Sequence, residues 1–246
     1  MRIAFRFKPV AFIAMLALVA LGIALGRWQD RRAAEKEAIA AQLATGTGAA
    51  PIELGPEPRS TAPLMYHRVR VTGTFVRDWP IYLDNRPHDG RAGFVVLMPF
   101  QVEGSPMHVL VARGWIPRDP SDRTRIAPYP TPTGTVTVEG VAKPGAGHVW
   151  QLGQPQAPTA GAIVQNVDLD DAMRTLQRPL HYLVLEQTSR DGSEGALVRD
   201  WPKADLGIDK HRGYAFQWYA LALMAFLFFL FTGLRSGSKQ NPKPNR

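Results

Sequence analysis

The chain lacks cysteine altogether, and acidic residues are absent from both of its ends. Without cysteine, disulfides and thiolate metal sites are excluded, and the redox compartment stays open. No Asp or Glu precedes Gln29 or follows Asp209, and each acid-free end holds one uncharged apolar stretch, at residues 10–25 and 214–234. This arrangement predicts a membrane protein with two spans that bracket one large extramembrane domain.

The net charge of +8 is confined to the ends of the chain. Residues 1–26 hold three basic side chains and residues 214–246 hold four; removing these seven from the total of 29 leaves 22 basic against 21 acidic residues. A nearly neutral domain with scattered charges is not typical of a polyanion binder, so we expect no nucleic-acid partner. The basic ends favour the cytoplasmic face of a lipid bilayer.

The second apolar stretch has the length of a transmembrane helix. Its 21 residues match the roughly 20 that cross a bilayer core. Tyr214, Trp218 and Tyr219 gather at one end, where aromatic rings prefer the level of the lipid headgroups. We therefore predict a span at residues 214–234, followed by a basic cytoplasmic tail at residues 235–246.

The first apolar stretch admits two interpretations. It is slightly short, and the basic tail of residues 1–9 before it also fits a cleavable signal peptide. The spacings Gly22-x-x-x-Gly26 and Ala20-x-x-x-Ala24 instead favour a retained span at residues 10–26, because small residues let helices pack closely in lipid. The glycine pair could pack the two spans together or dock a helix of a partner.

Between the spans the pattern changes from helix to strand. Residues 27–63 read as a helical extension that gives way near residue 45 to a Gly- and Pro-rich linker. Residues 64–213 form the predicted domain, where alternation of side chains indicates short strands. The strands are expected at residues 66–75, 79–85, 93–101, 107–116, 134–143, 161–166 and 181–187. One helix is expected at residues 168–177, with Asp168 as its N-cap. The fold class is thus α+β, with an antiparallel sheet curled into a barrel or sandwich.

The sequence contains none of the common catalytic motifs that we considered. The sequence contains no His pair at i, i+4, no H-E-x-x-H, no Gly-x-Ser-x-Gly elbow and no phosphate-binding or dinucleotide-binding glycine loop. A hydrolase that uses Asp84 or Asp89 with His88 is the remaining catalytic alternative, although Pro87 and Gly90 first indicate a tight turn there. We expect no enzymatic activity.

His211 differs from the other histidines by its position at the start of the second span. At helical spacing His211, Tyr214 and Trp218 share one face. A neutral imidazole is an axial ligand of haem iron, and Arg212, with Arg27 or Arg31 of the other helix, could pair with haem propionates. The alternative is an interfacial histidine that caps the helix or lies among headgroups.

Several stretches together resemble one known family. They are Gly26-Arg27-Trp28-Gln29, the strand at residues 66–75, Tyr82-Leu83-Asp84-Asn85-Arg86, Arg113-Gly114-Trp115-Ile116-Pro117, and His211-Arg212-Gly213-Tyr214-Ala215-Phe216-Gln217-Trp218. In this order they resemble the surfeit locus protein 1 family, assembly factors for haem-copper cytochrome c oxidase. The resemblance covers nearly the whole chain.

The resemblance implies a location and a role. Bacterial members place the domain in the periplasm and both termini in the cytoplasm of the inner membrane. Membership implies work with the haem a synthesis machinery and with oxidase subunit I, whose haem a centres the family helps to build. The family's expected haem a ligand matches His211, beside Arg212, Tyr214 and Trp218. A scaffold that stabilises nascent subunit I without binding haem is the second hypothesis.

Overall fold

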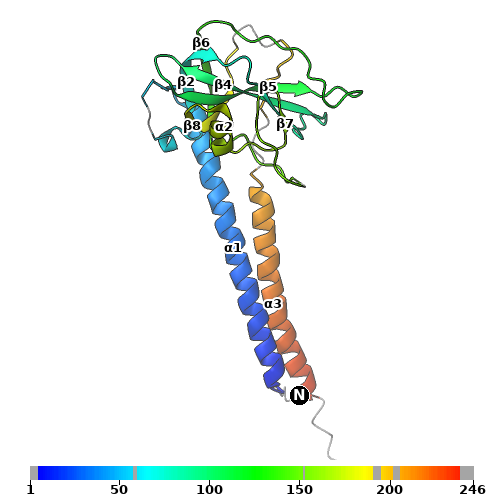
Figure 1. Ribbon diagram of the computed structural model, residues 1–246. Helices are drawn as coiled ribbons and strands as arrows, with labels where there is room; N and C mark the ends of the chain where they lie inside the picture. Colours follow the sequence, from blue (N-terminus) through cyan, green and yellow to red (C-terminus); the bar gives the residue numbers. More distant parts are fainter. Residues whose placement is uncertain (1–4, 58–59, 152, 191–194, 202–205, 239–246) are drawn as a thin grey trace, which may run out of the picture. The chain divides into compact units, whose positions relative to one another are not determined.

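The computed structural model describes residues 5–57, 60–151, 153–190, 195–201 and 206–238 (Figure 1). In chain order the elements are α1 (Pro9–Gly48), β1 (Ile52–Glu53), the 3-10 helix η1 (Ala62–Leu64), β2 (Arg68–Phe75), β3 (Ile81–Leu83), β4 (Gly93–Val102), β5 (His108–Pro117), β6 (Val136–Lys143), β7 (Ile163–Val164), α2 (Leu169–Leu176), β8 (Leu180–Gln187) and α3 (Ile208–Ser238). The chain divides into two compact units. Residues 1–40 and 204–246 form a helix pair, and residues 41–203 form a β-rich domain.

Five strands of the β-rich domain close into a barrel. They follow the order β2-β6-β8-β5-β4, and β4 pairs back onto β2. The closure takes place at Gly73, because β2 pairs with β6 from Arg68 to Gly73 and with β4 from Gly73 to Phe75. Closure removes the free edges that an open sheet would expose. β1 extends the sheet beside β2, and β3 with β7 extends it beside β4.

The predicted antiparallel, barrel-like sheet is confirmed in outline, with one difference. Four of the five pairings in the ring are antiparallel, whereas β5 and β8 run parallel. A parallel pair requires a long crossover connection, and here residues 118–179 make it through β6, β7 and α2. Local alternation of side chains carries no information about such a connection.

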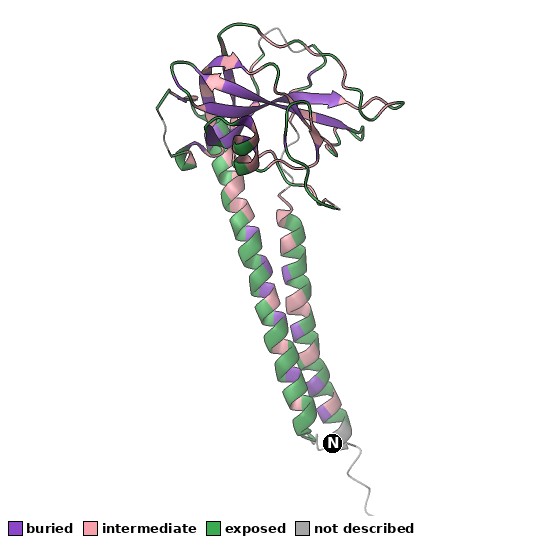
Figure 2. Cartoon of the chain, in the orientation of Figure 1, coloured by how far each residue is buried: buried purple, intermediate pink, exposed green. Residues whose placement is uncertain are grey.

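The side-chain alternation expected for the strands is seen as an alternation of buried and partly exposed residues. In β2 the residues Val69, Val71 and Phe75 turn inward and pack with Phe100 and other residues of the barrel core (purple strands in Figure 2). A second core cluster lies under α2, the helix predicted at residues 168–177. Its N-cap is Asp168, whose side chain accepts hydrogen bonds from the backbone of the first turn, as predicted.

The predicted linker at residues 45–63 is partly ordered secondary structure, which corrects the expectation. α1 continues to Gly48, and β1 pairs parallel with β2. The hydroxyls of Thr45 and Thr47 donate to the carbonyls of Ala41 and Leu43, so these residues bond within the helix instead of ending it. The Gly and Pro content of this segment predicted that the helix ends near residue 45. Composition alone does not reveal side-chain hydrogen bonds of this kind.

Candidate functional site

Two helices are long and apolar enough to cross a membrane. α1 has 40 residues and α3 has 31, which correspond to about 60 Å and about 46 Å at a rise of about 1.5 Å per residue. Both exceed the roughly 30 Å of a bilayer core. The two helices run side by side in Figure 1 and form an antiparallel pair. The C-terminal part of the predicted tail, residues 239–246, and residues 1–4 lie outside the described residues.

The helices meet along a seam with the seven-residue spacing of a coiled coil. On α1 the buried positions of the seam are Met15, Gly22, Gly26, Gln29 and Ala33, which follow one another at intervals of seven, four, three and four residues. On α3 the buried positions step by seven, seven and four and are Ala215, Ala222, Phe229 and Gly233. This repeat keeps one stripe of each helix against its partner (purple segments in Figure 2).

Small residues bring the two backbones close together. A Cβ atom built on Gly22 would lie 2.9 Å from the Cβ atom of Ala222 and 3.0 Å from the carbonyl oxygen of Trp218. One on Gly26 would meet the ring of Tyr219. The glycine spacing noted in the sequence therefore packs the two spans of this chain against each other. Ala20 and Ala24 are exposed on α1 and lie off the seam.

His211 lies at the polar end of this seam and is oriented by Gln29. The two side chains meet at 2.7 Å between Nδ1 of His211 and Oε1 of Gln29, and Gln29 is only 9% exposed. An amide oxygen can only accept a hydrogen bond, so with Oε1 of Gln29 facing the ring, the Nδ1–H group of His211 is the donor. In that tautomer the lone pair lies on Nε2. Metal-ligating histidines are commonly held in this way, by an acceptor on the second ring nitrogen.

The other predicted site residues lie around His211 in different environments. Trp218 is half-buried, and its backbone faces α1. Tyr214 is 53% exposed and lies off the seam, where Ala215 takes the buried position. Arg212 is exposed and forms an ion pair of 2.7 Å with Glu37. The structure therefore places His211, Arg212 and the backbone of Trp218 against residues of α1, and Tyr214 outward.

Sequence reasoning missed the residues of α1 that bind α3. Besides Gln29, the carboxylate of Asp30 accepts a 2.7 Å hydrogen bond from the hydroxyl of Tyr219. Glu37 then pairs with Arg212, which the sequence analysis had assigned to a propionate. Arg27 and Arg31 are exposed. The signal for Gln29 was present in the sequence, since it follows Gly22 and Gly26 at heptad spacing.

His211 is the residue of the helix pair that could hold a haem group through a single histidine. Among the described residues there is no cluster of three or more His, Asp or Glu side chains that could hold a bare metal ion. A porphyrin needs no such cluster, because its own nitrogens supply the equatorial ligands and the protein supplies axial ones. The seam itself is filled by small residues in contact.

Comparison with known proteins places the chain in a family. The SURF1 family model matches residues 16–223, which include the whole barrel, most of α1 and the first half of α3. The chain belongs to the SURF1 family. The family inferred from the residues around His211 and in the strands is therefore confirmed.

Relatives match over different shares of the chain. A SURF1-like protein of Monosiga brevicollis is 23% identical over 95% of this chain and 92% of its own length. A SURF1-like protein of Rickettsia bellii is 28% identical over 87% of this chain and 86% of its own length. The cytochrome oxidase assembly protein SHY1 of Saccharomyces cerevisiae is 31% identical over 44% of this chain and 28% of its own length.

Proposed function

We propose that this SURF1-family protein assists the assembly of cytochrome c oxidase by holding haem a at His211 and delivering it to subunit I. The yeast relative is a cytochrome oxidase assembly protein, which supports the assembly role. The observation that carries the haem role is the hydrogen bond between Nδ1 of His211 and Gln29, which leaves Nε2 as the ring nitrogen with a lone pair. No part of this role requires catalysis.

The helix pair suits a ligand that must be held and then released. Gln29 selects the tautomer and fixes the ring plane of His211, which strengthens the imidazole as a ligand. When bound, haem a would supply the iron that accepts the Nε2 lone pair. Attachment through one axial histidine holds the group less firmly than two strong axial ligands would. The exposed ring of Tyr214 and the half-buried Trp218 add aromatic side chains to the same end of α3.

The proposed setting is the bacterial inner membrane, with both termini in the cytoplasm and the barrel in the periplasm. Support comes from two helices of spanning length, from basic residues that follow the second span, and from a bacterial relative that matches most of the chain. In this setting His211 lies at the periplasmic level of the bilayer, near the haem a synthesis machinery that would load it.

A second candidate function is a scaffold that stabilises nascent subunit I without haem. One observation favours it: the polar bonds of Gln29 to His211, Asp30 to Tyr219 and Glu37 to Arg212 also join the two helices. In that case His211 would serve the packing of the spans alone.

An optical spectrum of the detergent-purified protein separates the two functions. The protein is made in cells that also synthesise haem a, beside a His211→Gly variant and a control His67→Gly variant in the barrel domain. Haem a in the wild type and in the control, lost in His211→Gly and restored by added imidazole, would support the carrier. Absence of haem a from the wild type, with oxidase assembly intact in His211→Gly, would overturn the carrier and favour the scaffold.

A further inference from the structure

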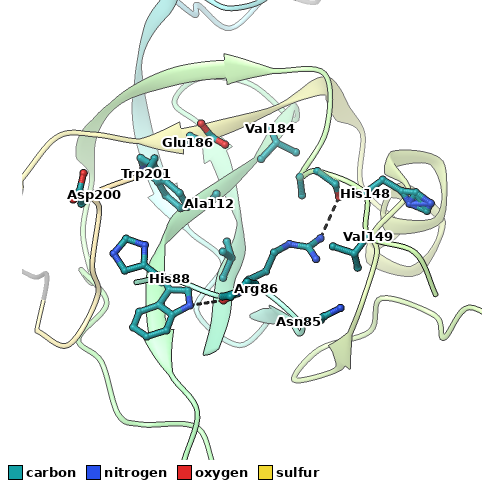
Figure 3. Close-up of a pocket in the computed structure, with 15 residues that line it drawn as sticks. Asn85, Arg86, His88, Ala112, His148, Val149, Val184, Glu186, Asp200 and Trp201 are labelled. Atoms are coloured by element: carbon teal, nitrogen blue, oxygen red, sulfur yellow. Dashed lines mark hydrogen bonds between the residues drawn. The ribbon is translucent and has the colours of Figure 1, made fainter. Parts of the chain in front are cut away.

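The barrel domain has a cavity of about 340 Å³ that the assembly function does not use (Figure 3). Ala112 of β5 and Val184 of β8 contribute its apolar lining, together with Val95 of β4. The loop after β3 brings Arg86, and the chain after β8 brings Trp201. This volume lies at the lower end of the roughly 300–1,000 Å³ of small-molecule sites.

The aromatic walls of the cavity are held in place by hydrogen bonds. Nε1 of Trp115 donates to the carbonyl of Arg86 at 2.7 Å, and Nε1 of Trp201 donates to the carbonyl of Gln187 at 2.8 Å. The ring of His88 lies 5.2 Å from the ring of Trp115. Because both indole N–H groups are used, the rings contribute their apolar surface to the lining. The cavity is therefore preformed and largely apolar.

Arg86 places a positive charge in this apolar cavity. Its guanidinium donates to the carbonyls of Asp84 at 3.2 Å, of Gly147 at 3.2 Å and of Gln165 at 3.0 Å. Asp84 is nearby, but its carboxylate is bonded to Arg118. Burial lowers the pKa of the Arg86 guanidinium from its ordinary value, against the opposing effect of Asp84. Carbonyl dipoles hold the guanidinium in position, but they do not neutralise its charge.

The acidic residues of the cavity do not balance Arg86. The carboxylate of Glu186 forms a 3.5 Å ion pair with Lys143, so this pair is neutral as a unit. Asp200 is exposed, and Figure 3 shows the Arg86 guanidinium pointing away from it. The guanidinium donates instead to the carbonyl of Gly147. Among the described residues no carboxylate forms an ion pair with Arg86, so the inner part of the cavity combines apolar walls with a guanidinium held by backbone carbonyls.

We propose that this cavity binds a small organic carboxylate with an apolar body, a ligand separate from haem a. The carboxylate would pair with Arg86 through the N–H groups that the three carbonyls leave free. The apolar body would lie against Trp201, Ala112 and Val184. The inference rests on the barrel domain alone and does not depend on the proposed function of His211.

Calorimetric titration of the full-length protein in an uncharged detergent tests the proposal. Three probes share one apolar body and differ in the head group: 3-phenylpropionate, 3-phenylpropionamide and 3-phenylpropylamine. We expect the carboxylate to bind about tenfold or more tightly than the amide, because only the carboxylate forms a charge-assisted bond with Arg86. Equal binding of the three probes, preference for the amine, or no binding of any of them would overturn the proposal.

Two variants locate the site. Arg86→Gln should reduce carboxylate affinity to that of the amide, whereas the exposed Arg125→Gln should leave it unchanged. Ala112→Leu fills the cavity without touching Arg86 and should abolish binding of all three probes. Thermal unfolding checks that each variant is folded; should Arg86→Gln unfold, Arg86→Lys replaces it and should keep the preference for the carboxylate, weakened. Wild-type affinity in Ala112→Leu would place the binding elsewhere and refute the assignment.

Discussion

Nδ1 of His211 and Oε1 of Gln29 lie 2.7 Å apart, although the two residues are 182 positions apart in the chain. Both belong to the seam between α1 and α3, where heptad spacing brings one stripe of each helix against the other. This hydrogen-bonded pair lies on the same seam as the small residues Gly22 and Gly26. Packing of the spans and orientation of the proposed haem ligand therefore depend on the same register of the two helices.

The first prediction concerns Gln29 as the positioning residue of His211. Gln29→Leu removes the acceptor for Nδ1–H, so the ring loses its fixed tautomer and plane. We expect haem a affinity to fall about 10- to 100-fold, the usual cost of removing such a partner. Gln29→Glu should keep haem bound and lower its reduction potential, because a carboxylate makes the imidazole more basic.

The matched control is Gln217→Leu, at an exposed position of α3. Haem titration followed by optical spectra, with a redox titration of the bound group, provides both readouts. If Gln29→Leu and Gln217→Leu both bind haem a as the wild type does, Gln29 does not position the ligand.

The second prediction concerns the close approach of the spans at Gly22. Gly22→Ala would place its methyl group 2.9 Å from that of Ala222, so the helices must separate. We expect the helix pair to lose about 1–3 kcal/mol, the usual cost of overpacking. Adding Ala222→Gly should recover part of this loss, since it removes the opposing methyl group.

Gly213→Ala is the control, because a Cβ atom there meets nothing within 4 Å. It should be neutral or stabilise α3 by about 0.5–1 kcal/mol, the helical preference for Ala over Gly. Unfolding in detergent mixtures measures all four proteins. Equal stability of Gly22→Ala and Gly213→Ala would contradict the packing at this seam.

The third prediction concerns Gly73, where β2 changes partner and the barrel closes. A Cβ atom at Gly73 would overlap the backbone carbonyl oxygen of Gln101 on β4, which cannot move without opening the ladder. Gly73→Ala should therefore destabilise the domain by more than about 3 kcal/mol, in the range of severe core disruptions. Gly134→Ala, just before β6, meets nothing within 4 Å and should leave stability unchanged. Thermal unfolding by circular dichroism compares the two; a stable barrel in Gly73→Ala would count against closure at this point.

The fourth prediction concerns pH and Glu139. Its carboxylate accepts hydrogen bonds from Arg68 and, at 3.1 Å, from Arg70, and these bonds lower its pKa from the ordinary value, against a smaller effect of burial. The folded state therefore binds a proton less readily than the unfolded state. The stabilisation is complete above the ordinary Glu pKa of about 4.5 and is lost as the pH falls through the lower folded value.

Glu139→Gln should consequently lower the melting temperature at neutral pH, and the difference from the wild type should shrink in acid. Glu103→Gln, at an exposed position, serves as the control. Thermal unfolding between about pH 3 and 7 makes the comparison. A difference between Glu139→Gln and the wild type that is independent of pH would show that Glu139 acts through something other than its charge.

Local patterns were sufficient for the elements of the barrel. The strand β2 (Arg68–Phe75) lies within the predicted range of residues 66–75, and α2 begins after the predicted cap, Asp168. Alternation and capping are properties of a few neighbouring residues, so a sequence displays them directly. The parallel pairing of β5 with β8 depends on residues far apart in the chain, and no local pattern encodes it.

By itself the sequence determined the two apolar helices, the β-rich domain between them and the family, because these follow from composition, periodicity and matching motifs. Only the tertiary structure decided which residues of α1 meet His211, that Gly22 and Gly26 face the second span, and that Arg86 lies in an apolar cavity. The physical reason is that helix register and barrel closure are set by the packing of distant segments, where the total burial of side chains selects one arrangement among many that local preferences allow.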